Sequence, residues 1–266
     1  MNITESYKKH RIFNEIDFMM ESYEFISTSS SSFFQGGVSA TANIDSIIYS
    51  SLKNTLESIK TLLKIGKIND GFGLVRKYFE GVIIDVYKTV YIREKYDFFK
   101  TPYADMIEKW YKGEKSLPPY KNMISYLNRA KSLDNIRQYF DISENGYYNG
   151  IKDKCNDNLH YNKFVYMLLN NSDYYFKGRE SYLSLILSCI ANIFELHIAC
   201  IFLLHPEYLT STDYIDSLEC GETPIEGSQN WTSPFGENLF NKLWKNKPEI
   251  AKCIKNNTFL IFEDDR

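Results

Sequence analysis

The chain has 266 residues and a formal net charge of −3, so it can bury a substantial core and carries no overall basic field. This charge balance argues against an architectural DNA-binding protein, and any contact with nucleic acid would need a local basic patch. The 13 Gly and 7 Pro residues are few, while 21 Tyr and 18 Phe are many. Because helix breakers are sparse, we expect long helices.

The five cysteines are an odd number at wide spacings, with no C-x-x-C pair and no histidine at metal-binding distance in the sequence. This usage favours a reduced, cytoplasmic protein without a metal site. The N-terminal residues lack the apolar run of a signal peptide. The longest apolar stretch, 181–204, contains Asn192, Glu195 and His197, so we expect a buried helix there and no membrane span.

Residues 3–26 predict an amphipathic helix, because apolar residues recur at steps of three and four. The serine-rich run at 27–32, five serines and Thr28, predicts a flexible linker that ends near residue 39. In the predicted domain organisation, the first part is therefore an N-terminal helix and linker at 1–39. The apolar stripe of this helix can pack on the body of the chain or on a second copy of it.

Two long helices are predicted at 43–65 and 70–96, with Asn43 as the N-cap of the first and Gly66 as the left-handed residue after its end. The short link predicts an antiparallel pair. Arg76 and Glu80 lie four residues apart on the second helix. They are compatible with a surface ion pair contributing about 0.3–0.5 kcal/mol, and equally with a role in a site.

The next segment is predicted to consist of short helices. One begins at Thr101 and Pro102 and ends at Gly113, and two others occupy 120–131 and 133–140. Gly146 is expected in the left-handed conformation of a turn. A helix from about 147 to 168 and a long helix at 178–204, ended by Pro206, complete this part.

Beyond residue 208 the chain becomes irregular for about 30 residues, with a short helix at 238–245 and a strand-like tail at 258–262. We expect four aromatic residues here to pack against the body, since they would otherwise be exposed: Trp231, Phe235, Trp244 and Phe259. The predicted fold is all-α, with a helical bundle at 40–205 and an irregular C-terminal extension at 206–266 packed on it.

A polar block at 153–162, Asp-Lys-Cys-Asn-Asp-Asn-Leu-His-Tyr-Asn, interrupts the apolar pattern. Asn156 and His160 are four residues apart, so a helix would place both on one face. The same residue types are typical of helix caps and turns, and a solvated helix end is the alternative. The chain has no Gly-rich phosphate loop, no nucleophile elbow and no H-E-x-x-H motif.

This order of helices resembles the HEPN family of helical-bundle nucleases and nucleotide-binding proteins. Residues 155–160, Cys-Asn-Asp-Asn-Leu-His, align with the Arg-Asn-x-x-x-His form of the family motif, and residues 74–80 resemble the second-helix segment of many members. The resemblance covers about 40–205. Cys155 stands at the arginine position of the motif, and a thiol has neither the charge nor the forked donors of arginine.

The resemblance implies metal-independent RNA cleavage with no cofactor. His160 would act as general base or acid, Asn156 would position the phosphate or orient His160, and Lys154 would stabilise developing charge. The further candidates for substrate binding are Lys152, Asn158, Tyr161, Arg76 and Glu80. The resemblance also implies a homodimer and a role, with a partner protein, in toxin–antitoxin or antiphage defence. The competing hypothesis is a degenerate member that binds a nucleotide, RNA or protein without cleavage.

Overall fold

The computed structural model describes residues 3–32, 44–95, 105–139, 146–171 and 177–266. Over these ranges the chain forms helices and isolated β-bridges but no strand, which confirms the predicted all-α class. The predicted N-cap Asn43, the predicted helix start at Thr101 and Pro102, and linker residues 33–39 lie outside the described residues.

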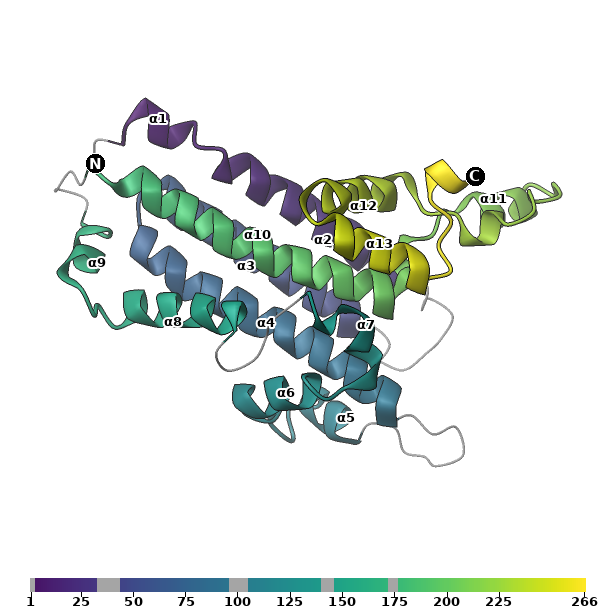
Figure 1. Cartoon of the computed structure of the whole chain (residues 1–266), viewed down its shortest axis with the longest axis horizontal. Coiled ribbons are helices and arrows are strands. Elements are labelled where there is room, and N and C mark those ends of the chain that lie inside the picture. Colours follow the sequence, from purple (N-terminus) through teal and green to yellow (C-terminus); the bar gives the residue numbers. More distant parts are fainter. Residues whose placement is uncertain (1–2, 33–43, 96–104, 140–145, 172–176) are drawn as a thin grey trace.

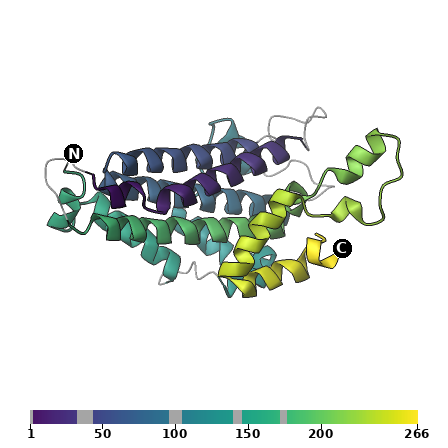
Figure 2. The same cartoon turned by 90° about the horizontal axis from the view of Figure 1, so that it is seen from above.

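Four long helices form the body and lie along its long axis (Figures 1 and 2): α2 (Ile12–Ser32), α3 (Ile44–Lys64), α4 (Ile68–Lys95) and α10 (Arg179–Leu204). The shorter elements are α1 (Glu5–Lys8), α5 (Asp105–Tyr111), α6 (Tyr120–Leu127), η2 (Lys131–Leu133), α7 (Asp134–Arg137), α8 (Tyr147–Leu159), α9 (Phe164–Leu168), η3 (Pro206–Leu209), α11 (Asp213–Glu219), η4 (Ser228–Asn230), α12 (Pro234–Asn246), α13 (Pro248–Asn257) and η5 (Glu263–Asp265).

The chain reverses between α3 and α4 at Gly66, whose φ of 77° is the left-handed conformation that glycine adopts without strain. Early residues of α3 meet late residues of α4: Lys88 pairs with Asp45, and a methyl group added at Gly81 would lie 2.7 Å from a Leu52 side-chain carbon. The two helices therefore run in opposite directions. The missing side chain at Gly81 allows their close approach.

The serine run does not form the predicted linker, because α2 continues through Ser32. The Ser27 hydroxyl donates to the carbonyl oxygen of Ser46 at 2.9 Å, and the Ser31 hydroxyl donates to the Ser46 hydroxyl at 2.7 Å. These contacts with α3 supply tertiary partners that outweigh the weak helix propensity of serine. The apolar stripe of α2 is buried in the body of its own chain, with Ile12 and Ile16 fully covered.

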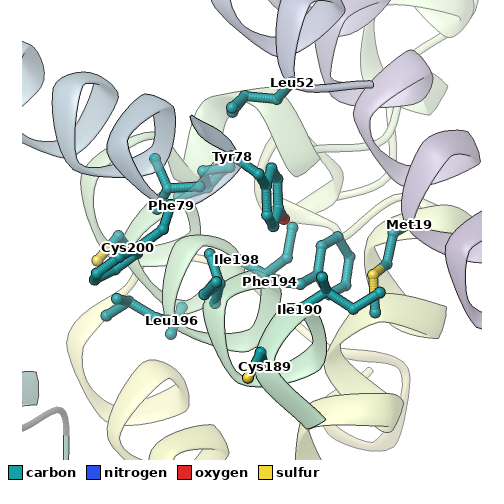
Figure 3. Close-up of a cluster of buried hydrophobic side chains, with 14 of the residues drawn as sticks. Met19, Leu52, Tyr78, Phe79, Cys189, Ile190, Phe194, Leu196, Ile198 and Cys200 are labelled. Carbon is teal, nitrogen blue, oxygen red and sulfur yellow. The ribbon is translucent and has the colours of Figure 1, made fainter. Parts of the chain in front are cut away.

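Helix α10 lies at the centre of the core (Figure 3), where its Phe194 and Ile190 face side chains from neighbouring helices, including Met19 of α2. By length and composition α10 would suit a membrane span, but 72% of its most apolar 18-residue window is buried among other helices. One continuous core contains residues of α2, the long helices and the C-terminal segment. The core is thus continuous across both predicted boundaries, at 39 and at 205.

A polar network is buried where α2, α3, α4 and α10 meet. Lys88 Nζ donates to Asp85 at 3.0 Å and also to Asp45. His197 bonds Asp85 at 2.9 Å and the Tyr23 hydroxyl at 2.8 Å, so this histidine of the apolar helix is a hydrogen-bonded core residue. Burial disfavours charge on Asp85, but Lys88 and His197 outweigh it and hold the Asp85 pKa well below its ordinary value.

The C-terminal segment is more helical than predicted. The expected helix at 238–245 spans Pro234–Asn246, because the Ser233 side chain caps it by accepting from the Gly236 N–H at 3.1 Å. Helix α13 follows where no helix was predicted, and α11 forms in the segment predicted to be irregular. The strand-like tail is wrong, since the described part of 258–262 has only an isolated bridge between Trp231 and Ile261.

Aromatic packing in this segment also differs from expectation. Phe240 and Phe262 stack with ring centroids 3.8 Å apart and join the core. Trp231 and Phe235 are half-buried, but Trp244 and Phe259 remain 47% and 48% exposed. Two rings that sequence reasoning did not single out therefore anchor the extension, and two that it did single out are at the surface.

The short helices between α4 and α8 are shorter than predicted. Helix α6 ends at Leu127 and α7 covers only Asp134–Arg137, so neither fills its predicted range. Gly113 has a φ of 73° and follows α5, as a helix stop should. Gly146 was predicted to be left-handed, but its φ is −79°, because it is the N-cap of α8 and its backbone is extended.

Candidate functional site

The polar block begins inside α8 and ends in a helix terminus. Helix α8 stops at Leu159, His160 is its C-cap, and the helix predicted to run on to 168 is interrupted before α9. The Tyr161 N–H donates to the Asn158 carbonyl oxygen at 3.2 Å, and the Asn162 N–H donates to that of Asp157 at 3.1 Å. This pair of bonds is a Schellman motif. Tyr161 takes its left-handed position, with φ 50°, where glycine is usual.

Helix α8 packs along the N-terminal half of α4 in the opposite direction. Asn69 Nδ2 donates to the Asn158 carbonyl oxygen at 3.0 Å, and a methyl group added at Gly73 would lie 3.2 Å from the Leu159 side chain. Further along, the rings of Phe79 and Tyr148 stack with centroids 6.0 Å apart. These contacts fix which face of α8 meets α4.

Arg76 of α4 is brought to Asn156 of α8. Its Nη1 donates to the Asn156 side-chain oxygen, and its Nε donates to Glu80 at 3.1 Å. Arg76 and Glu80 are partly exposed, at 32% and 37% of their side-chain surface. Arg76 and Glu80 therefore form the ion pair that their spacing allows. The Arg76 guanidinium also links α4 to α8 at the polar block.

Cys155, at the motif's arginine position, is fully buried. Burial in apolar surroundings raises the pKa of its thiol to about 12, so the group is neutral at pH 7. A buried neutral thiol cannot bind a phosphate. In this structure the position is part of the hydrophobic core.

The two candidate lysines lie on different sides of α8. Lys154 and Asn156 are two residues apart, so they point about 160° from each other on the helix. Lys154 is exposed, and its charge opposes the burial that raises the pKa of Cys189 on α10 to about 11. Lys152 is four residues from Asn156 and therefore shares its face, where its Nζ lies 5.0 Å from the Tyr120 ring centroid.

Tyr120 of α6 is a member of this cluster that sequence reasoning missed. Burial, and then the charge of Glu80, raise the pKa of its hydroxyl. Its only local signal is a helix start after Pro119, and nothing in the sequence links residue 120 to residues 76 and 152. We call the following five residues the α4–α8 cluster: Arg76, Glu80, Asn156, Lys152 and Tyr120.

His160 is exposed at the end of α8, one turn from Asn156 and about 40° around the helix axis. Its backbone N–H donates to the Asn156 carbonyl oxygen at 3.0 Å, and its ring makes no hydrogen bond within the described residues. Asn158 is buried instead, and its Nδ2 donates to the Lys154 carbonyl oxygen at 2.8 Å. The exposed face thus carries His160 and the cluster, while Asn158 faces the body.

Large apolar side chains surround the exposed end of α8. Leu159 and Tyr161 are partly exposed, and Phe164 and Met167 of α9 reach 73% and 51%. We call these four residues the α8–α9 patch. Exposed apolar residues of this size that lie close together in the chain are a candidate interaction surface.

Within the described residues, no three His, Cys, Asp or Glu side chains are arranged to hold a metal ion. The arrangement therefore offers a cation, an amide and an imidazole on one face of α8. The HEPN resemblance rests on the residues quoted from the sequence, since no protein-family model, curated protein or solved structure matches this chain.

Proposed function

We propose that this protein is a HEPN-like, metal-independent endoribonuclease in which Arg76 supplies the charge that Cys155 lacks. The observation that supports the proposal is the hydrogen bond from the Arg76 guanidinium to Asn156, on the face of α8 that also presents His160. Lys154, the cation first expected here, lies on the other side of the helix. Lys152 shares the face of Asn156 and is the second cation of the proposed site.

The donors of Arg76 suit this role. A guanidinium has five N–H donors, and two of them are used by Glu80 and Asn156. Within the described part of the chain the remaining donors have no partner, and they are available for the oxygens of a phosphodiester, which guanidinium groups bind through paired hydrogen bonds. The orientation set by Glu80 and Asn156 reduces the cost of ordering Arg76 on substrate binding.

In the proposed reaction the ribose 2′-hydroxyl attacks the adjacent phosphorus and the 5′-oxygen leaves. His160 transfers a proton, either from the 2′-hydroxyl or to the leaving oxygen, and a histidine is suited to both near neutral pH. Arg76 and Lys152 stabilise the charge on the phosphate oxygens. Asn156 positions the phosphate or orients His160.

The test is cleavage of mixed RNAs by the pure protein in EDTA. We expect Arg76→Ala to reduce cleavage about 10²–10³-fold and His160→Ala about 10²–10⁴-fold. Lys154→Ala is the matched control on α8 and should change the rate less than about threefold, because one distant surface charge contributes little. Circular dichroism checks that each variant is folded. The proposal is overturned if the folded wild type cleaves no RNA, or if cleavage survives His160→Ala.

The second candidate function is a binding module that does not cleave RNA. The burial of Cys155 and the lack of a partner for the His160 ring within the described residues favour it. Such a protein would bind RNA or a nucleotide through Arg76 and lose that binding on Arg76→Ala, with no cleavage by any variant. A fluorescence-anisotropy titration alongside the cleavage assay separates the two functions.

We also propose that the protein is a homodimer that joins its two His160 sites across the α8–α9 patch. The exposed Phe164 and Met167 support this, because a twofold axis brings the same patch of both copies together. A shared cleft would then present two clusters to one RNA. The role in toxin–antitoxin or antiphage defence stays a prediction of the resemblance, and the cytoplasmic location stays a prediction from the cysteine usage.

A further inference from the structure

A groove of about 710 Å³ lies between α2, α10 and α12, apart from the α4–α8 cluster. The apolar part of its floor comes from all three helices, and each of its side chains is only 1–4% exposed: Met19, Phe194, Ile198, Leu239 and Leu243. Figure 3 shows the Met19 and Phe194 side chains near each other in the buried cluster between α2 and α10. The volume falls in the range of small-molecule sites, about 300–1,000 Å³.

The charged residues of the groove are unevenly paired. Its two carboxylates are engaged: Glu15 pairs with Lys242 at 2.7 Å, and Glu195 pairs with Lys247 at 3.5 Å. Arg11 and Lys245 are exposed at the rim and have no ion-pair partner within the described residues. Three cations and two carboxylates line the groove, so its net charge is +1.

An apolar floor with two unpaired cations at the rim selects a particular kind of ligand. A hydrocarbon or aromatic body would cover the floor, and one acidic group would reach Arg11 and Lys245. A polyphosphate is disfavoured because a net charge of +1 cannot neutralise several negative charges. A cationic ligand would meet the unpaired cations and no free carboxylate.

We propose that this groove binds a small organic anion that carries one acidic group on an apolar body. Such a ligand touches α12 of the C-terminal segment and α2 and α10 of the bundle at once. Because it binds only the folded arrangement of these three helices, it raises the apparent stability of the protein in proportion to its occupancy.

The experiment uses decanoate as the probe, with decanol and decylamine as neutral and cationic probes of the same chain length, all below their aggregation concentrations. Isothermal titration calorimetry gives the stoichiometry and Kd, and thermal unfolding gives the change in Tm. We expect saturable binding of one decanoate with a rise in Tm, at least tenfold weaker binding of decanol, and no binding of decylamine.

Two variants locate the site. Arg11→Gln with Lys245→Gln should weaken decanoate binding about tenfold for each lost charge, since a charge-assisted hydrogen bond is commonly worth a factor of ten or more. Ala191→Trp should block binding by filling the groove, where Ala191 is half-buried. Lys252→Gln is the matched control, because Lys252 is an exposed lysine of α13 outside the groove.

The rim residues are exposed, so the double variant tests the proposal even if Ala191→Trp does not fold. The proposal is overturned if the wild type binds no decanoate, if decylamine or ATP binds as tightly, or if the double variant keeps the wild-type Kd. It is equally overturned if only an amphipathic peptide occupies the groove.

Discussion

Replacing Lys88 with methionine tests whether the buried network holds the bundle together. Lys88 is 2% exposed and is paired with two carboxylates, Asp85 on its own helix and Asp45 on α3. Methionine fills similar space but leaves Asp85, itself 3% exposed, without its cation. Breaking a buried ion pair by removing one partner costs about 3–5 kcal/mol. This is a large part of the roughly 5–15 kcal/mol that stabilises most domains.

The assay is urea unfolding followed by circular dichroism at pH 7, where the free energy of unfolding is extrapolated to zero urea. Lys53→Met is the matched control, because Lys53 pairs with Glu24 on the surface, where the pair is worth about 0–1 kcal/mol. Adding Asp85→Leu to Lys88→Met should recover part of the loss, since it removes the uncompensated charge. If Lys88→Met costs no more than Lys53→Met, the network does not stabilise the fold.

Four further outcomes are expected. Because the pKa of Asp85 is lowered and that of Lys88 is raised, their contribution to the free energy of unfolding should be constant from about pH 4 to 10 in urea titrations. It should be lost below this range as Asp85 is protonated, and above it as Lys88 is deprotonated. Tyr161→Gly should raise the free energy of unfolding by about 1 kcal/mol by relieving its positive φ. Phe164→Glu should shift a dimer to a monomer in light scattering. Cys155→Arg should destabilise the protein by several kcal/mol in urea without raising RNA cleavage, because it buries an unpaired charge.

The long helices could be located from the sequence because their apolar residues repeat over many turns. The predicted 43–65 and 178–204 lie within one residue of Ile44–Lys64 and Arg179–Leu204 at each end. The serine run was misread because its helical state depends on Ser46, which lies outside the local pattern. The break after α8 was also missed, since a tyrosine occupies the left-handed position where a glycine would have signalled it.

The candidate site shows the limit of local patterns more directly. The spacing of Asn156 and His160 predicted a shared side of one helix, and the His160 N–H donates to the Asn156 carbonyl oxygen. The cation that contacts Asn156 is Arg76, however, and not Lys154, the nearer one in sequence. Arg76 reaches Asn156 across 80 residues of chain, and this contact requires the packing of α4 on α8. No periodicity within either helix contains that information.

The cation of the proposed site therefore comes from a different helix than the amide and the imidazole, which ties activity to helix packing. Gly73 lies one turn before Arg76, and the Leu159 side chain approaches the position of its missing Cβ to 3.2 Å. A bulky residue at Gly73 would have to displace the Leu159 side chain at the end of α8. We expect it to weaken the contact between Arg76 and Asn156, while every proposed catalytic group remains present. An arginine in the motif itself would be held by α8 alone. Because Cys155 is in the core and carries no charge, the proposed site forms only when α4 is packed against α8.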